Sequence, residues 1–123
     1  MLKFGTFVNV ADNSGATKAQ IIGTFGGTKR KVIRLGNVVK VTVKAARPHA
    51  GVKKSELFRA VVVRVKKEHR REDGTYIRFD DNAVVLLDGT TNEPKGTRIF
   101  GPVARELKAH GFDKITYLAP ETL

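Results

Sequence analysis

Short runs of apolar residues at alternating positions are the main pattern along this chain. In residues 37–45, three valines at every second position alternate with lysine and threonine. A period of two predicts a strand that turns one face to a core and the other to solvent. Comparable runs rich in Val, Ile, Thr and Phe occupy residues 6–11, 18–25, 37–45, 59–67, 75–79 and 83–87.

Glycine-rich turns separate these runs. The clearest is Asp73-Gly74, which predicts a tight hairpin because both central residues can adopt positive φ. Five or six short strands at this spacing predict a mainly β fold, a small closed β-barrel rather than a flat sheet, since closure removes exposed strand edges. On strands 37–45 and 59–67 we expect one face in the barrel core and the other to present Lys and Arg outward.

The C-terminal part has a different pattern. Residues 102–108 predict a short helix with Pro102 at its first position. Gly111 is the expected terminator. The apolar residues of segment 112–118 recur at helical spacing, although a strand is possible there, and Pro120 ends the segment. With no linker or repeat, we expect a single domain over 1–123, with the barrel at about 1–100 and the short helical piece at about 101–123.

Composition narrows the class of protein. The chain has 123 residues, a net charge of +11 and no cysteine. The absence of cysteine excludes a disulfide framework, a thiolate metal site and a thiol nucleophile. No apolar stretch approaches the roughly 20 residues that span a bilayer, and the N-terminus is too polar for a signal peptide. We therefore expect a soluble intracellular protein whose partner is anionic.

The positive charge is concentrated in one segment. Residues 29–71 contain 15 basic and two acidic residues, whereas residues 72–123 contain six basic and nine acidic ones. This segregation predicts one cationic face rather than a uniformly basic surface, and nucleic acid is the usual partner of such a face.

Catalytic patterns have little support. The glycine-rich stretch 23–29 lacks the spacing of a phosphate-binding loop, and no helix pattern follows it. The three histidines lie far apart with no metal-ligand spacing, so we expect surface or RNA-facing positions for them. Asp80-Asp81 is interpreted as part of a turn. The sequence therefore predicts no enzyme, no cofactor, no metal site and no small-molecule substrate.

The basic residues recur in four clusters. A single charged run is usually a solvated surface, but recurrence within one segment favours phosphate binding, because Arg and Lys match phosphate oxygens. The run that enters the Asp73-Gly74 hairpin is well placed to follow a phosphate backbone. The candidate RNA-binding residues are Lys29, Arg30, Lys31, Lys44, Arg47, Lys53, Lys54, Arg64, Lys66, Lys67, Arg70 and Arg71.

Aromatic residues indicate which kind of RNA is bound. Phe7, Phe25, Phe79 and Phe112 fall at apolar positions, so their expected role is in the core. Tyr76, near the hairpin tip, is the one weak candidate for base stacking. Cations on a rigid barrel with few stacking aromatics fit folded RNA better than a single strand read by sequence.

The stretch Ala60 to Leu86 resembles the signature of the bacterial-type large-subunit ribosomal protein family L-fourteen. The resemblance lies in a small residue and three aliphatics, then Asp73-Gly74, an aromatic, an asparagine and a Val-aliphatic pair. The stretches NVADNSGA (9–16) and GTRIFGPVAREL (96–107) also resemble the family. The resemblance covers essentially the whole chain.

This resemblance implies a five-stranded barrel with a small helical C-terminal piece. It implies binding to large-subunit rRNA beside ribosomal proteins L-three and L-nineteen, and contact with small-subunit rRNA in intersubunit bridges. It also implies a docking surface for a ribosome silencing factor that includes Thr97, Arg98 and Lys114. The expected location is the ribosome, cytoplasmic or organellar.

Two other functions stay open on the residues alone. The first is a free-standing RNA-binding barrel that acts as a translation factor or RNA chaperone. The second is a binder of membrane surfaces or acidic proteins, which is disfavoured because such proteins carry their cations on an amphipathic helix. Here the cations lie on predicted strands and hairpins, so we expect no membrane partner.

Overall fold

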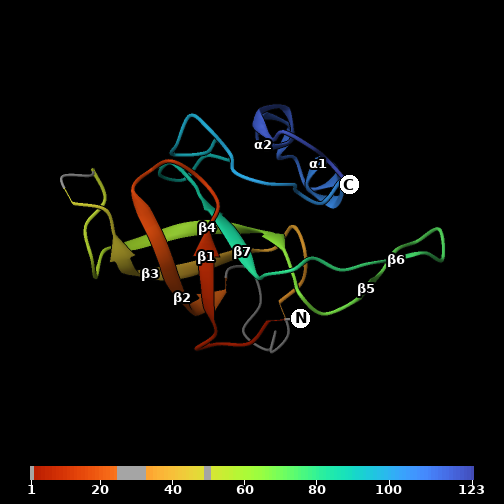
Figure 1. Cartoon of the computed structure of the whole chain (residues 1–123), viewed down its shortest axis with the longest axis horizontal. Coiled ribbons are helices and arrows are strands. Elements are labelled where there is room, and N and C mark those ends of the chain that lie inside the picture. Colours follow the sequence, from red (N-terminus) through yellow and green to blue (C-terminus); the bar gives the residue numbers. More distant parts are fainter. Residues whose placement is uncertain (1, 25–32, 49–50) are drawn as a thin grey trace.

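Five strands form a closed barrel in the computed structural model, which describes residues 2–24, 33–48 and 51–123 (Figure 1). Consecutive strands of the barrel pair antiparallel. The barrel closes where its last strand, which pairs antiparallel with the fourth, also pairs in parallel with the first. The predicted closed five-stranded barrel is confirmed. Its strands are β1 (Phe7–Val10), β2 (Ala16–Thr24), β3 (Val38–Ala46), β4 (Leu57–Arg64) and β7 (Ala83–Leu86).

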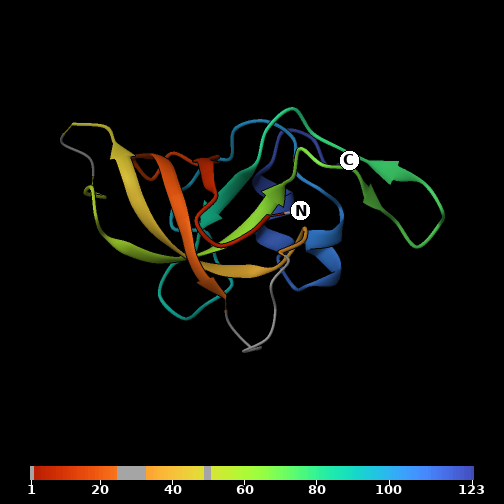
Figure 2. The ribbon, with the colours of Figure 1, turned by 90° about the horizontal axis from the view of Figure 1, so that it is seen from below.

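The run at 75–79 lies outside the barrel. It supplies β6 (Tyr76–Ile77), which pairs with β5 (His69–Arg70) in a two-stranded hairpin. Figure 2 shows this hairpin extending away from the barrel on the side of the C-terminus. β4 ends at Arg64 rather than at residue 67, and the chain then leaves the barrel to enter the hairpin.

The hairpin turn differs from the prediction. Only Gly74 has a positive φ, of 86°, and Asp73 does not. The Arg71 N–H donates to the Thr75 carbonyl and the Gly74 N–H donates to the Arg71 carbonyl, so the loop has three residues. A three-residue loop requires one left-handed residue, and glycine adopts that conformation without steric penalty.

The interior of the barrel follows the period of two. Val39, Val41 and Val43 on β3 are fully buried, whereas Lys40 and Lys44 are exposed. The predicted inward and outward faces of this strand are confirmed. Because the inward side chains of all five barrel strands meet in one cluster, burial of their apolar area stabilises the barrel as a unit.

β7 is buried on both faces, and so is β4 from Ala60 onward, whereas Leu57 at the start of β4 is exposed. On β4, Ala60 and Val62 point into the barrel core, whereas Val61 and Val63 join a second apolar cluster under the C-terminal helices. The expectation that this strand presents cations outward is therefore wrong. A strand that is apolar on both faces requires a covering layer, and the C-terminal segment supplies it.

The first helix starts later than predicted. α1 covers Glu106–Ala109, and Val103 lies instead in a bridge with Thr122. The extended backbone before α1 pairs with the C-terminal residues, which keeps residues 102–105 out of the helix. None of the helices in the described ranges is long and apolar enough to cross a membrane.

Gly111 ends α1, as predicted. Its φ is 87°, and its N–H donates to the Lys108 carbonyl at 3.2 Å. The Phe112 N–H donates to the Leu107 carbonyl at 3.0 Å, so the two bonds form a Schellman cap. α2 (Asp113–Leu118) follows directly, with Ile115 fully buried in the second cluster. The alternative of a strand in this segment is thereby excluded.

Asp12 joins the turn after β1 to β7. Its Oδ1 accepts hydrogen bonds from the N–H and the hydroxyl of Ser14, and its Oδ2 accepts the Leu86 N–H at 3.1 Å. Burial raises the pKa of this carboxyl above its ordinary 3.8, and these three bonds offset the rise only in part. The Asp12 carboxylate therefore accepts a hydrogen bond from the backbone N–H of buried Leu86, but its own burial disfavours the charged form of the carboxyl.

We expect Asp12→Ala to lower the free energy of unfolding at pH 7 by about 1–3 kcal/mol, because the Leu86 N–H loses its acceptor. The raised pKa means that the folded state binds the proton more tightly. The stabilisation from this carboxyl is therefore largest at low pH, and it falls as pH rises from 3.8 through the folded-state pKa.

Urea unfolding of both proteins between pH 3 and pH 7 measures this dependence. The difference between wild type and Asp12→Ala should widen toward low pH. Asp88→Ala, a change at an exposed carboxyl, is the matched control and should give a small difference at every pH. A difference that narrows on acidification contradicts the assigned sign.

Candidate nucleic-acid interface

The candidate cations fall into three groups in the structure. Lys29, Arg30 and Lys31 lie outside the described residues. Arg64 and Arg71 are largely shielded from solvent. The exposed group consists of Lys44, Arg47, Lys53, Lys54, Lys66, Lys67 and Arg70.

Four of the exposed cations line one hollow at the β3–β4 connection, which we call the basic hollow. Lys44, Arg47, Lys53 and Lys54 surround it, and the buried Val52 anchors its wall. Among the described residues that line it, none is acidic. Four positive charges around a concave surface are an arrangement that suits the phosphates of a folded nucleic acid.

The hairpin carries the other exposed cations. Lys66 and Lys67 follow β4, and Arg70 lies on β5. The Lys66 N–H donates to Asn82 Oδ1 at 2.7 Å, which holds the base of the hairpin against the barrel while the side chain stays exposed. The hairpin thus presents cations well away from the basic hollow.

Arg64 has a structural role and does not lie on the exposed cationic surface that the sequence predicted for it. Its side chain is 11% exposed, and its Nε lies 2.9 Å from Asp81 Oδ1. Its Nη1 donates to the carbonyls of Phe100, at 2.8 Å, and Pro102, at 2.9 Å. The guanidinium therefore holds the end of β4, the β6–β7 connection and the start of the C-terminal segment together.

Asp81 is the anionic partner of this arrangement rather than only a turn residue. Burial raises its pKa, but hydrogen bonds from Arg64 and Asn9 and the charge of Arg64 outweigh burial, so the net pKa is lowered. The carboxylate stays ionised at neutral pH. Sequence alone pointed to a turn here because adjacent residues in or near a strand usually point to opposite faces, whereas the partner of Asp81 lies 17 positions away.

Arg71 is also withdrawn from solvent. Its Nη2 lies 3.0 Å from Glu106 Oε1 and donates to the Leu123 carbonyl, so it ties the hairpin to α1 and the C-terminus. His69, expected at the surface, is half-buried, with its Nε2 3.8 Å from Glu106 Oε2. Arg71 is therefore a positioning residue for the hairpin.

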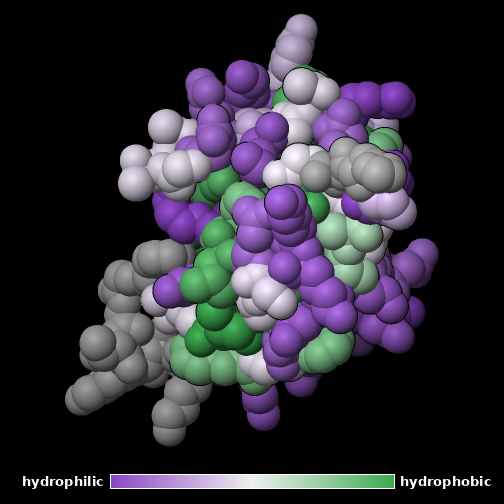
Figure 3. Space-filling view, turned by 90° about the vertical axis from the view of Figure 1, so that its left-hand side faces the viewer, coloured by the Kyte–Doolittle hydropathy of each residue, from purple (hydrophilic) through white to green (hydrophobic). Residues whose placement is uncertain are grey.

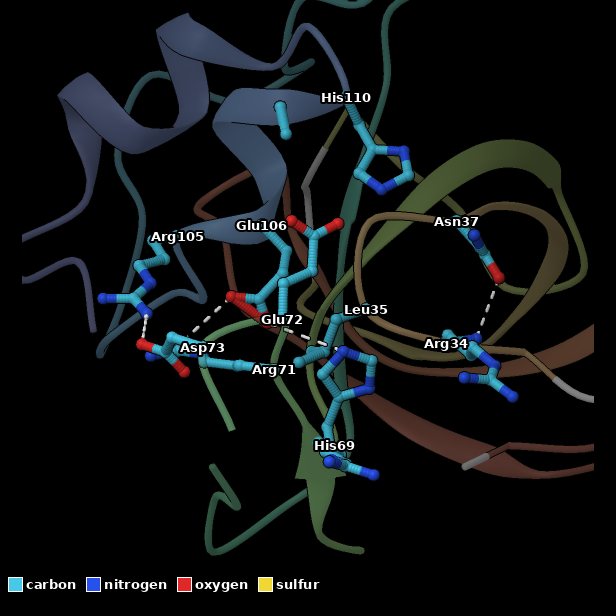
Figure 4. A pocket seen from close by; sticks show the side chains of 12 residues that line it. Arg34, Leu35, Asn37, His69, Arg71, Glu72, Asp73, Arg105, Glu106 and His110 are labelled. Atoms are coloured by element: carbon cyan, nitrogen blue, oxygen red, sulfur yellow. Dashed lines mark hydrogen bonds and ion pairs between the residues drawn. The ribbon is translucent and has the colours of Figure 1, made fainter. Parts of the chain in front are cut away.

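These residues line a groove of about 910 Å³ between the hairpin, residues 34–37 and α1 (Figure 4). On one wall Arg105 pairs with Asp73 at 2.9 Å. Hydrogen bonds from Thr75, together with Arg105, lower the pKa of Asp73 to about 2. Sequence reasoning missed Arg105 and Glu106, because their partners lie more than 30 positions away and no local pattern marks them.

The aromatic residues divide differently from the prediction. Phe79 and Phe112 are buried, as expected, and Phe25 lies outside the described residues. Phe7 was expected in the core but is 58% exposed, because its strand turns Val8 and Val10 inward. Tyr76 is exposed on the hairpin.

The residues implied for silencing-factor docking are exposed. Asn13 Oδ1 accepts the N–H of Thr97 at 2.8 Å and the N–H of Arg98 at 3.1 Å, which fixes their loop against the β1–β2 turn. The Arg98 guanidinium lies over the Phe100 ring. Lys114 on α2 pairs loosely with Glu93, at 3.9 Å. The loop and the helix thus present two cations on the C-terminal part.

The described residues hold no group of three or more His, Cys, Asp or Glu side chains arranged for a metal ion. The described cations fall into two sets: exposed ones at the basic hollow and the hairpin, and shielded ones in ion pairs that position the hairpin.

Comparison with known families agrees with this architecture and with the resemblance seen in the sequence. The family model described as ribosomal protein L14p/L23e matches residues 1–123, which is the whole chain. Members of this family are structural components of the ribosome rather than enzymes. The chain belongs to the ribosomal protein L14p/L23e family and is a structural constituent of the ribosome.

Proposed function

We propose that this protein binds large-subunit rRNA through the basic hollow and the exposed cations of the hairpin. The observation that carries the proposal is the basic hollow itself, where Lys44, Arg47, Lys53 and Lys54 surround a concave surface whose described lining has no carboxylate. Lys29, Arg30 and Lys31 belong to the same proposal on sequence alone.

The rigid barrel makes this binding efficient. Lys44 is on β3, and Val52, next to Lys53, is fully buried, so the cations project from a fixed backbone. Little backbone entropy is then lost when phosphates bind. Each neutralised phosphate releases counterions, so affinity falls steeply with salt.

The hairpin supports a second contact. It extends away from the barrel with Lys66, Lys67 and Arg70 exposed (Figure 2). An arm of this kind reaches an RNA that the barrel face does not touch, and we assign it to small-subunit rRNA in an intersubunit bridge. The exposed Tyr76 on β6 adds a surface for stacking at that contact.

Protein partners fit the C-terminal part better. Residues 72–123 carry more acidic than basic residues, which disfavours bare phosphate. We assign ribosomal proteins L-three and L-nineteen to this side of the molecule, and a ribosome silencing factor to the surface with Thr97, Arg98 and Lys114. The complex forms in the cytoplasmic or organellar ribosome.

Removing two cations of the basic hollow tests the RNA contact. In filter binding to purified large-subunit rRNA, Lys53→Ala/Lys54→Ala should reduce the slope of log affinity against log salt by roughly 1.4–1.8, at about 0.7–0.9 per phosphate. Lys108→Ala/Lys114→Ala removes the same charge from α1 and α2 and should leave the slope close to that of wild type. Equal losses in both variants would show that only net charge matters.

The hairpin arginines should have different effects. Arg70→Ala should weaken incorporation into ribosomes without changing the melting temperature, because this side chain is exposed. Arg71→Ala should raise the amide exchange rates of the hairpin and of residues near Leu123, because it removes the link to Glu106 and the C-terminus. Unchanged exchange in Arg71→Ala would contradict its role as a positioning residue.

Charge reversal at the C-terminal surface tests the silencing-factor contact. Arg98→Glu/Lys114→Glu should abolish co-purification with a ribosome silencing factor and leave rRNA affinity within about twofold, because both cations lie apart from the basic hollow. Lys108→Glu on α1 is the control and should retain the factor. Retention of the factor by the double variant would place its docking surface elsewhere.

A further inference from the structure

Three exposed apolar side chains lie on the outer face of β1–β4. Phe7 is 58% exposed, Leu57 is 55% exposed and Ile22 is 43% exposed. Figure 3 shows hydrophobic side chains at the surface among hydrophilic ones on one side of the barrel. Single exposed apolar residues are normal on protein surfaces, so the question is whether these three are arranged.

The strand register places two of them in one row across the barrel. Phe7 is opposite Gln20, Gln20 is opposite Thr42, and Thr42 is opposite Leu57. We call these four residues the open row. Three gaps between strands make the row about 14 Å long. Ile22 is exposed two positions from Gln20, next to an irregularity in the β2–β3 pairing.

Cations flank the open row on both sides. Lys18 on β2 and Lys44 on β3 lie two positions from the row toward one end of the strands, and Lys40 lies two positions away toward the other end. All three are exposed. The sequences of β1, β2, β3 and β4 contain no aspartate or glutamate.

An exposed aromatic ring and aliphatic side chains flanked by cations fit an anionic polymer that also carries flat, apolar groups. Exposed aromatic side chains on a barrel stack bases of unpaired RNA, while neighbouring cations follow the backbone. Duplex RNA keeps its bases stacked inside the helix, so it offers phosphates to the cations but no base to Phe7. A protein partner would have to match three cations with carboxylates around a narrow apolar strip.

We propose that the open row is a stacking platform for unpaired bases of RNA, with Phe7 as its aromatic anchor. The proposal rests on the proposed rRNA-binding function and adds the kind of RNA that this face takes. Phe7 is held by a rigid strand whose neighbour Val8 is buried in the core, so the ring is presented with little loss of backbone entropy.

A tryptophan reporter tests stacking directly. The chain has no tryptophan, so Phe7→Trp introduces the single tryptophan, on the open row, and its emission can be excited apart from that of the two tyrosines. An oligoadenylate of eight nucleotides should quench its fluorescence, and a duplex of the same length should quench it much less. Tyr117→Trp, at an 85% exposed position on α2, is the control and should not be quenched by either RNA.

Affinity measurements give an independent readout. Phe7→Ala should weaken binding of the unpaired oligonucleotide by about 5- to 150-fold, the effect of losing one stacked base. The salt slope should stay unchanged, because no cation is removed. Phe7→Tyr should restore most of the affinity, and Tyr117→Ala should bind as wild type does.

Two results overturn the proposal. The first is equal affinity of Phe7→Ala and wild type for unpaired RNA, with no quenching in Phe7→Trp. The second is a loss of ribosome incorporation in Phe7→Ala with unchanged RNA affinity, which would assign the face to a protein partner. If the proposed function itself fails, wild type binds no RNA in these titrations. Salt-dependent binding of wild type, together with either result above, means that RNA binding holds and that only the stacking platform is wrong.

Discussion

Burial on both faces of β7 and of β4 from Ala60 onward is the constraint on which the rest of the structure depends. Alternate residues of these two strands enter the barrel core and the cluster beneath the C-terminal helices. The barrel therefore cannot be separated from its C-terminal segment without exposing Val61, Val63 and Val85 to water. One side of the barrel is covered for this reason, whereas Phe7 on β1, Ile22 on β2 and Leu57 at the start of β4 remain exposed.

Charge is used in two distinct ways. Arg64 and Arg71 are shielded from solvent, and each is paired with a carboxylate and donates to at least one backbone carbonyl, because a buried guanidinium without partners would be strongly destabilising. They fix the path of the chain out of β4 and the orientation of the hairpin. The exposed cations of the basic hollow line a surface whose described residues include no carboxylate, which suits the phosphate binding proposed for them.

The family assignment and the geometry address different levels of function. Membership of a ribosomal protein family places the chain in the ribosome as a structural component. The geometry distinguishes three surfaces of the chain: the basic hollow, the projecting hairpin, and a barrel face where the open row with its exposed aromatic residue is flanked by lysines. The fixed strand register gives the third surface its spacing, which a flexible basic tail would lack.

The sequence by itself determined the strands, the barrel, the cationic middle segment and the cap at Gly111, since each depends on local periodicity, composition or a single left-handed residue. Only the tertiary structure decided that Phe7 faces solvent and that Arg64 and Arg71 are ion-paired. Whether a residue is apolar or charged does not determine which face of the fold its side chain occupies. That choice depends on register and on partners such as Asp81 and Glu106, which folding brings close from distant positions in the chain.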